Sequence, residues 1–189
     1  MGELILIRHG QTEWNLSGRH AGRTDIPLTE EGEAAATSLA PRLARRRPVA
    51  VFSSPLSRAM RTAELAGLTG VRPDPDLMEW DYGGYEGLTA AQIQGRRPGW
   101  DLWRDGVIPG EELRQVAART DAVLDRVRPL LADGDVAIVA HGHLARVLTV
   151  RWLGLDASAG RLLGHPHPGT LSFLATEDEQ PFIAAWNVP

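Results

Sequence analysis

Short apolar runs alternate along the chain with longer segments in which apolar residues recur every three to four positions. The clearest runs are residues 4–7, 49–52 and 136–140, which consist of Leu, Ile, Val, Ala and Phe. A continuous apolar run of this length is typical of a buried strand, and the wider spacing is typical of an amphipathic helix. Strands that alternate with helices indicate a mostly parallel sheet with helices on both faces. The pattern therefore predicts an α/β fold.

The remaining elements follow from the same pattern and from helix start signals. Thr29 stands before acidic residues, and Pro55 follows a serine, as at helix N-termini. The predicted helices are residues 29–46, 54–67, 111–131 and 144–153, with a weak helix from about residue 89. The further predicted strands are residues 77–78, 170–175 and 182–186. We expect residues 1–189 to form one domain, in which residues 80–110, rich in Gly, Trp and Pro, form a lid-like lobe.

Polar residues follow each predicted parallel strand. Arg8 and His9 follow the first strand, and Arg58 lies in the helix after the second. Glu79 follows the short third strand, and His141 follows the fourth. Because α/β sheets bind ligands at the carboxyl ends of their strands, we expect these side chains to converge. Converging cations need a compensating anion, and arginine pairs well with phosphate oxygens, so the pattern predicts a phosphate site.

Composition narrows the chemistry further. The 189 residues carry a net charge of -4, with no polybasic run that would favour nucleic acid or a membrane surface. The absence of cysteine excludes disulfides, thiolate zinc sites and cysteine nucleophiles. All 20 basic residues are arginine, which excludes Schiff-base lysines and the lysine of P-loops. No apolar run approaches the roughly 20 residues of a membrane span and no signal peptide is recognisable, so we expect a cytoplasmic protein.

Five motifs, taken in order, resemble those of the histidine phosphatase superfamily in its phosphoglycerate mutase-like branch. They read RHGQTEWN, GRTDIPLTEEG, SSPLSRAMRTAE, EWDYGGYEGLT and HGH, and the match extends from residue 4 to about residue 153. The resemblance implies a three-layer αβα sandwich whose mixed sheet is parallel except for one edge strand. It also implies a metal-independent phosphomonoesterase that acts through a phosphohistidine and needs no cofactor.

The resemblance also implies roles for single residues. His9 would be the nucleophile, and Glu79 would protonate the leaving oxygen. Arg8, Arg58 and His141 would bind the transferred phosphoryl group. The candidate substrate-binding residues are Thr12, Asn15, Gly22, Tyr82 and His143. Neighbouring arginines should lower the pKa of His9, and its second ring nitrogen should donate to a fixed acceptor, which the sequence leaves open.

Other polar residues have competing interpretations. His143 could contact substrate or cap the following helix, and His20 could lie near the pocket or in solvent. His165 and His167 could bind a metal, but a proline-rich turn explains them better because no matching carboxylates or cysteines are evident. Asp74 follows no apolar strand, which disfavours an aspartyl-phosphate nucleophile.

The segment 80–110 bears on the class of enzyme. In this interval the mutases of the family carry an insertion rich in Arg and Lys, whereas here the basic residues are only Arg96, Arg97 and Arg104. The aromatic residues of the interval suggest an apolar-edged mouth; they are Trp80, Tyr82, Tyr85, Trp100 and Trp103. The few arginines favour a phosphatase over a mutase, and the string EWDYGGYEG most resembles the small bacterial acid phosphatases of the family, which implies an acid phosphatase. From the aromatic edge we expect a broad range of small phosphomonoester substrates. The alternatives are phosphoglycerate mutase-type transfer and a phosphate-binding module without turnover; pairing into a homodimer is open.

Overall fold

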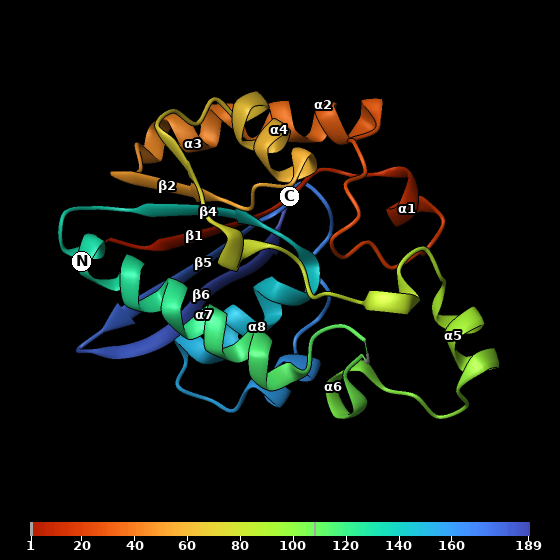
Figure 1. Cartoon of the computed structure of the whole chain (residues 1–189). Helices are drawn as coiled ribbons and strands as arrows, with labels where there is room; N and C mark the ends of the chain where they lie inside the picture. The colour runs from red at the N-terminus through yellow and green to blue at the C-terminus, as the bar shows by residue number, and fades with distance from the viewer. Residues whose placement is uncertain (1, 108) are drawn as a thin grey trace.

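A six-stranded sheet forms the centre of the computed structural model, which describes residues 2–107 and 109–189 (Figure 1). Residues 1 and 108, which belong to the predicted domain and lobe, lie outside the described residues. The strands are β1 (Leu4–Arg8), β2 (Ala50–Ser53), β3 (Val71–Pro73), β4 (Val136–Ala140), β5 (Leu171–Glu177) and β6 (Gln180–Val188). Their order across the sheet is β3-β2-β4-β1-β5-β6.

The direction of the strands confirms the mixed, mostly parallel sheet. Strands β1 to β4 run parallel, β5 runs antiparallel to β1, and β6 runs antiparallel to β5. The expectation that the antiparallel strand lies at the edge was wrong, because β6 extends the sheet beyond β5. Asp178 and Glu179 both have positive φ, 47° and 65°, as a tight hairpin turn between these two strands requires.

Helices cover both faces of the sheet (Figure 1). One face carries α2 (Glu30–Ser38), α3 (Ala40–Arg46) and α4 (Ser57–Leu65), and the other carries α7 (Leu113–Val127) and α8 (Gly142–Trp152). Alternate residues of β1 serve the two layers: Ile5 and Ile7 belong to the core with α2 to α4, whereas Leu4 and Leu6 belong to the core with α7 and α8. This two-sided burial explains why the strand reads as an unbroken apolar run. Within the described residues, no helix is long and apolar enough to cross a membrane.

Several predicted boundaries need correction. The helix predicted over residues 29–46 divides at Leu39 into α2 and α3, because Pro41 lacks the N–H that would continue the helix. The predicted strand at residues 77–78 does not form; a 3₁₀ turn, η1 (Pro75–Leu77), takes its place. The third parallel strand is β3 at the sheet edge, so Glu79 does not follow a strand directly. The helix predicted over residues 111–131 is shorter in the structure, where a 3₁₀ turn, η3 (Arg128–Ala132), forms its last part.

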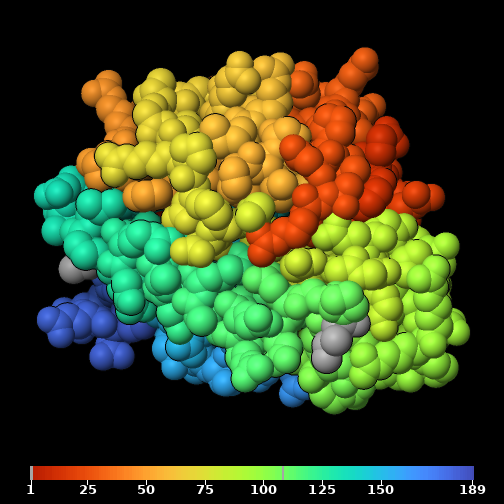
Figure 2. Space-filling model, viewed as in Figure 1, coloured from red at the N-terminus to blue at the C-terminus, as the bar shows by residue number. Residues whose placement is uncertain are grey.

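The lobe after Glu79 contains η2 (Gly83–Tyr85), α5 (Ala90–Arg96) and α6 (Leu102–Asp105). Helix α5 confirms the weak helix near residue 89, where Thr89 accepts a hydrogen bond from the Gln92 N–H. Trp80 and Trp100 are 0% and 8% exposed, so they form the interior of the lobe and not the edge of a mouth. The lobe contacts the segment after β1, which includes a short helix, α1 (Glu13–Leu16) (Figure 2). In this contact the His20 N–H donates to the Leu88 carbonyl. A last 3₁₀ helix, η4 (Ala157–Leu162), was not predicted.

Candidate active site

The ends of β1 and β4 bring two histidines together. These strands are parallel neighbours in which Arg8 pairs with Ala140. His9 and His141 are the residues that follow directly, one after each strand. Both side chains are buried, and their ring centroids lie 5.0 Å apart. Arg58, in the first turn of α4, is also buried and donates from Nε to Nδ1 of His141 at 3.3 Å. The structure thus brings together the four residues that follow predicted strands 1, 2 and 4.

His9 has its ring orientation and tautomer set by its neighbour. Its Nδ1 lies 2.6 Å from the carbonyl oxygen of Gly10, which can only accept a hydrogen bond, so Nδ1 carries the proton. Nε2 is then the nitrogen with a free lone pair. Burial lowers the pKa of His9 well below 6.5, and the charges of Arg58 and Arg8 lower it further. The Gly10 carbonyl is the fixed acceptor that the sequence left open.

Arg58 and His141 already have partners. His141 accepts from Arg58 at Nδ1, so its Nε2–H donates to the Ser54 hydroxyl at 2.8 Å. Arg58 donates through its terminal nitrogens to the carbonyls of Ala21, Gly22 and Thr24, at 3.2, 2.8 and 2.9 Å respectively. Four of its five N–H groups are therefore used, and one Nη1–H is left. Arg58 fixes the 21–24 loop behind the histidines.

Arg8 contacts the segment before β5. Its Nη1 donates to the carbonyl of Pro166, and its Nε is the one buried side-chain polar atom of the described residues that has no hydrogen-bond partner. Burial lowers the pKa of Arg8 to about 10, partly offset by the negative charge of Glu79. A buried donor without a partner is rare in folded proteins, and a bound anion would satisfy it.

Glu79 is buried against the N-terminus of α8. Its Oε1 accepts from the backbone N–H groups of Trp80 and Leu144, each at 2.9 Å, and its Oε2 accepts from that of His143 at 3.0 Å. These three backbone N–H groups fix the orientation of the Glu79 carboxyl group. Since each carboxylate oxygen has two lone pairs, Oε2 keeps one position for a proton.

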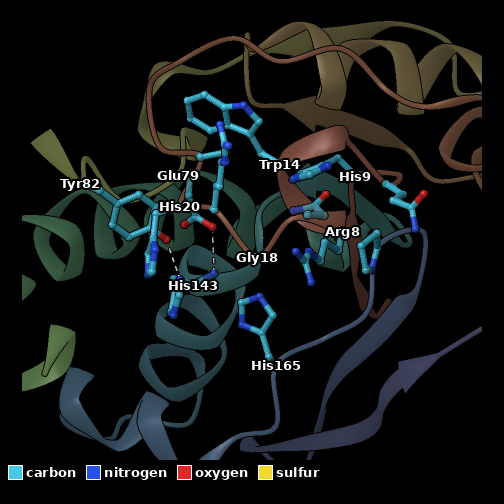
Figure 3. A pocket seen from close by; sticks show the side chains of 14 residues that line it. Arg8, His9, Trp14, Gly18, His20, Glu79, Tyr82, His143 and His165 are labelled. Carbon is cyan, nitrogen blue, oxygen red and sulfur yellow. Dashed lines mark hydrogen bonds between the residues drawn. The ribbon is translucent and has the colours of Figure 1, made fainter. Parts of the chain in front are cut away.

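A cavity of about 370 Å³ lies between these groups (Figure 3). Its lining comprises Arg8, His9, Gln11, Trp14, Asn15, Gly18, Arg19, His20, Ala21, Glu79, Tyr82, His143, His165 and Pro168. Of the predicted residues, Arg58, His141, Thr12 and Gly22 stand behind the lining and not in it. Thr12 is buried and forms a reciprocal capping pair with Asn15.

Gly22 has a steric role. A Cβ atom there would lie 2.4 Å from a carboxylate oxygen of Glu86 and 2.6 Å from the carbonyl oxygen of Trp80. Glu86 holds the same loop, because its carboxylate accepts from the backbone N–H groups of Arg23 at 2.6 Å and Thr24 at 2.7 Å. The 21–24 loop therefore requires glycine at this position.

Three further histidines line the cavity: His20, His143 and His165. The Tyr82 hydroxyl lies 2.6 Å from Nδ1 of His143, and the ring of His143 lies 4.9 Å from that of His165. Burial lowers the pKa of His143 well below 6.5. The N-cap of α8 is His141, so His143 contributes its ring to the cavity instead of capping the helix. His20 lines the cavity as well, with its ring edge-on to Tyr82 at 5.0 Å.

His165 is the cavity residue that sequence reasoning placed elsewhere. The proline-rich turn brings it beside α8, where a Cβ on Gly142 would come within 2.5 Å of its ring. His167 of the same turn is exposed and uses its backbone N–H to bind Asn187. Among the described residues, no group of three or more His, Asp or Glu side chains is arranged to hold a metal ion. No sequence signal marked His165, because its position depends on the pairing of β5 with β1.

Known proteins resemble this chain in sequence and in fold. The model of the histidine phosphatase superfamily (branch 1) matches residues 4–189. An acid phosphatase from Mycobacterium tuberculosis is 39% identical over 86% of this chain and 81% of its own. A glucosyl-3-phosphoglycerate phosphatase from the same species is 36% identical over 88% and 87%. A solved structure of an open reading frame product from M. tuberculosis superposes with a TM-score of 0.92 at 34% identity, over 99% of this chain and 97% of that one.

Proposed function

Because the chain belongs to branch 1 of the histidine phosphatase superfamily, we propose that it is a metal-independent phosphomonoesterase acting through a phosphohistidine. The observation that carries the proposal is the state of His9. A buried imidazole whose Nδ1 donates to Gly10 has a neutral, unprotonated Nε2 beside Arg8. Such a nitrogen is a nucleophile in the place where an anion would be attracted. Glu79 lies across the cavity from it (Figure 3).

The proposed reaction has two steps. In the first, His9 Nε2 attacks phosphorus, the bond from phosphorus to the alcohol oxygen breaks, and Glu79 gives its proton to that oxygen. In the second, Glu79 takes a proton from water as the water attacks the phosphohistidine, which releases phosphate and restores His9. The free Nε–H of Arg8 would stabilise the charge on the phosphoryl oxygens, and the positive charge of Arg58, behind the cavity lining, would add to this stabilisation. His141 would act by fixing Arg58.

We propose acid-range activity on several small phosphomonoesters. The low pKa of His9 supports activity below neutral pH, because the nucleophile keeps its lone pair there. The aromatic mouth no longer supports a broad range, since Trp80 and Trp100 are buried. Support comes instead from the open side of the cavity, where the lining residues Gly18 and Arg19 are exposed to solvent. An open side places few steric limits on the size of the leaving group.

Mutase-type transfer has less support. A phosphoglycerate carries a carboxylate beside its phosphate, which favours a second cationic subsite. Apart from Arg8, the only arginine in the cavity lining is Arg19, which is exposed. The distribution of charge in the cavity therefore favours hydrolysis over the transfer of a phosphoryl group between two positions of an anionic substrate.

The deciding experiment is phosphate release with a chelator present. The panel contains nitrophenyl phosphate, sugar phosphates, phosphotyrosine and 3-phosphoglycerate, and the enzyme is also tested after His9→Ala. We expect release from several esters, loss of release in the variant, and an acid-labile phosphoryl group on His9 in quenched wild-type enzyme. Conversion of 3- to 2-phosphoglycerate without net release would establish a mutase, and phosphate binding without turnover would establish a binding module.

We further propose that the chain works in the cytoplasm as a single domain on small phosphomonoesters, without nucleic acid or a membrane, and that residues 80–110 cover one side of the cavity. One cooperative unfolding transition is expected for a single domain. Sedimentation at increasing concentration measures whether two copies associate.

A further inference from the structure

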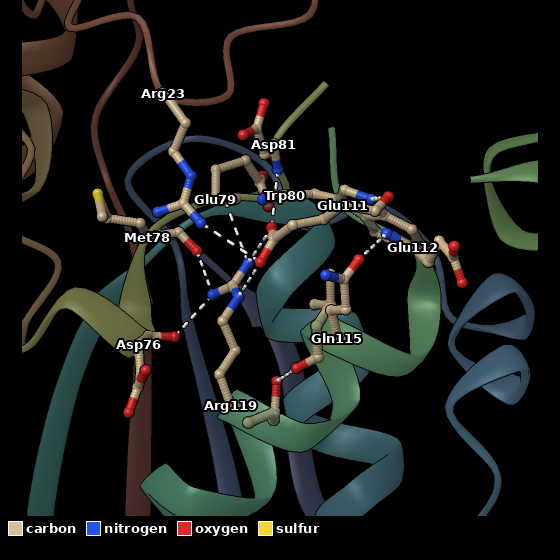
Figure 4. A network of polar contacts seen from close by, with 12 residues as sticks. Arg23, Asp76, Met78, Glu79, Trp80, Asp81, Glu111, Glu112, Gln115 and Arg119 are labelled. Carbon is tan, nitrogen blue, oxygen red and sulfur yellow. Dashed lines mark hydrogen bonds and ion pairs between the residues drawn. The ribbon is translucent and has the colours of Figure 1, made fainter. Parts of the chain in front are cut away.

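Arg119 of α7 uses every hydrogen-bond donor that it has. Its Nε and Nη2 donate to the two carboxylate oxygens of Glu111 at 2.8 and 3.0 Å. Its Nη1 donates to the carbonyls of Asp76 at 2.7 Å and Met78 at 2.5 Å, and Nη2 also donates to that of Glu79 at 3.2 Å. The side chain is only 10% exposed (Figure 4). All five N–H groups of the guanidinium are therefore committed to one short segment and one carboxylate.

That segment is the one that presents Glu79. It follows η1 and belongs to no strand, so no sheet ladder fixes the carbonyls of Met78 and Glu79. Arg119 supplies the missing donors. Glu79 is thus held at two points, its carboxylate by the N-terminus of α8 and its backbone by Arg119.

Glu111 extends the same network to the other side of Glu79. Its Oε2 accepts from the Asp81 N–H at 2.9 Å, and its backbone N–H donates to the Asp81 carbonyl at 3.0 Å. Its Oε1 also pairs with Arg23 at 3.3 Å, within the 21–24 loop that Arg58 holds. Glu111 balances the charge of Arg119 and is 14% exposed, so the pair is largely shielded from water.

We propose that Arg119, together with Glu111, is a positioning residue for the proton transfer by Glu79. The inference rests on the proposed function, in which Glu79 protonates the leaving oxygen. Arg119 lines no part of the cavity and contacts no substrate; it fixes the backbone from which the Glu79 carboxyl reaches the cavity. Its loss should impair leaving-group protonation and spare the attack by His9.

Two conservative variants disturb the network and a third is the control. Arg119→Lys keeps the positive charge but has three donors in place of a planar set of five, so it cannot hold both Glu111 and three carbonyls. Glu111→Gln keeps the shape and removes the charge. Arg126 lies two turns further along α7 and binds the carboxylates of Asp74 and Asp76, each at 2.7 Å, but reaches neither Met78 nor Glu79. Arg126→Met therefore loosens the same segment without releasing Glu79.

The measurement is kcat/KM for nitrophenyl phosphate and for an alkyl phosphate, because kcat/KM includes the step in which the alcohol leaves. For Arg119→Lys and Glu111→Gln we expect the alkyl ester to lose about tenfold to a hundredfold more than the nitrophenyl ester, which needs little protonation. Arg126→Met should change both esters equally. The thermal midpoint of each variant measures general destabilisation separately.

Glu79→Gln and the double variant Glu79→Gln/Arg119→Lys complete the test. If Arg119 acts through Glu79, Arg119→Lys should cause no additional ester-dependent loss once Glu79 is replaced. An equal loss on both esters in the single variant, or the full additional loss in the double variant, would overturn the positioning role. The proposed function fails separately, if wild-type enzyme releases no phosphate. The acid role of Glu79, and with it the positioning role of Arg119, fails if Glu79→Gln affects both esters alike.

Discussion

The two sides of the cavity are built differently. On the side of His9, regular elements place the functional groups: β1 and β4 end side by side, and α4 presents Arg58 behind them. On the opposite side, Glu79 and His165 come from segments outside the sheet, which side chains hold in place. Arg119 binds the first segment, and Arg8 binds the second through the Pro166 carbonyl. In the proposed reaction, the attack on phosphorus is the same for every phosphomonoester, and it would occur on the rigid side. The alcohol differs from one substrate to another, and it would contact the side whose segments are held by single side chains.

His9→Ala should have the largest effect, because it removes the proposed nucleophile from the rigid side. We expect phosphate release to fall roughly a thousandfold or more on every ester. Circular dichroism and the thermal midpoint should still report a folded chain, since β1 keeps its pairing with β4 and β5. A variant within tenfold of wild type would remove His9 as nucleophile.

Glu79→Gln should have the next largest effect, and it should depend on the ester. Alkyl phosphates should slow by about a hundredfold, because their alkoxide leaves poorly without a proton. Nitrophenyl phosphate should lose much less. Kinetics of both esters at one pH check the difference; similar losses would mean that Glu79 serves the phosphoryl group and not the leaving oxygen.

The rigid side is also the part that could be predicted from the sequence. The runs at residues 4–7, 49–52 and 136–140 became strands because helices bury both their faces, and the residues after them were brought together by the strand order. Strand β3 was missed because it lies at the sheet edge and reads Val-Arg-Pro, in which valine is the one apolar side chain before the proline. Edge strands are less buried and carry a weaker pattern.

The opposite side could be predicted only in part. The motif around Glu79 marked that residue, but the strand expected before it does not exist, and Arg119 holds it instead through contacts distant in sequence. Trp80 and Trp100 were interpreted as a rim, because composition does not distinguish an aromatic residue inside a lobe from one on its edge. His165 reached the cavity through the pairing of β5 with β1, which no local pattern announces.

The buried histidines predict a pH dependence of stability. Burial lowers the pKa of His9, His141 and His143 well below 6.5 in the folded chain. Below pH 6.5 the unfolded chain takes up protons at these positions and the folded chain does not, so the free energy of unfolding should fall as the pH falls. Each group contributes up to about 1.4 kcal/mol per pH unit, and none contributes well above pH 6.5, where both states are neutral.

Urea unfolding at pH 7.5, 6 and 5 measures this slope. His143→Gln removes one of the three groups, and it should flatten the decline between pH 6 and 5 by up to about 1.4 kcal/mol per unit. Identical slopes in the variant and the wild type would show that His143 takes up a proton in the folded chain. Phosphate release by the wild type should meanwhile persist at pH 5 as long as the chain stays folded, because the lowered pKa of His9 favours its neutral form.

The smallest expected effect separates two histidines of one turn. Both are exposed, but His165 lines the cavity with its ring 4.9 Å from that of His143, whereas His167 is not part of the lining and its backbone N–H donates to Asn187. If the turn contributes to binding of the alcohol, His165→Ala should raise KM for sugar phosphates by two- to tenfold. Such a change corresponds to the binding free energy of about one hydrogen bond. The variant's kcat for nitrophenyl phosphate should stay close to wild type, since His165 has no part in the proposed attack by His9.

His167→Ala is the matched control, because it removes the same ring from the same proline-rich turn. Its KM should equal that of wild type for every ester. If both variants raise KM equally, the turn matters only through its fold, and the alcohol does not contact His165. If only His165→Ala raises KM, the segment before β5 contributes to substrate specificity. That result would directly support the division of the cavity into a rigid side that binds phosphate and an adjustable side that binds the alcohol.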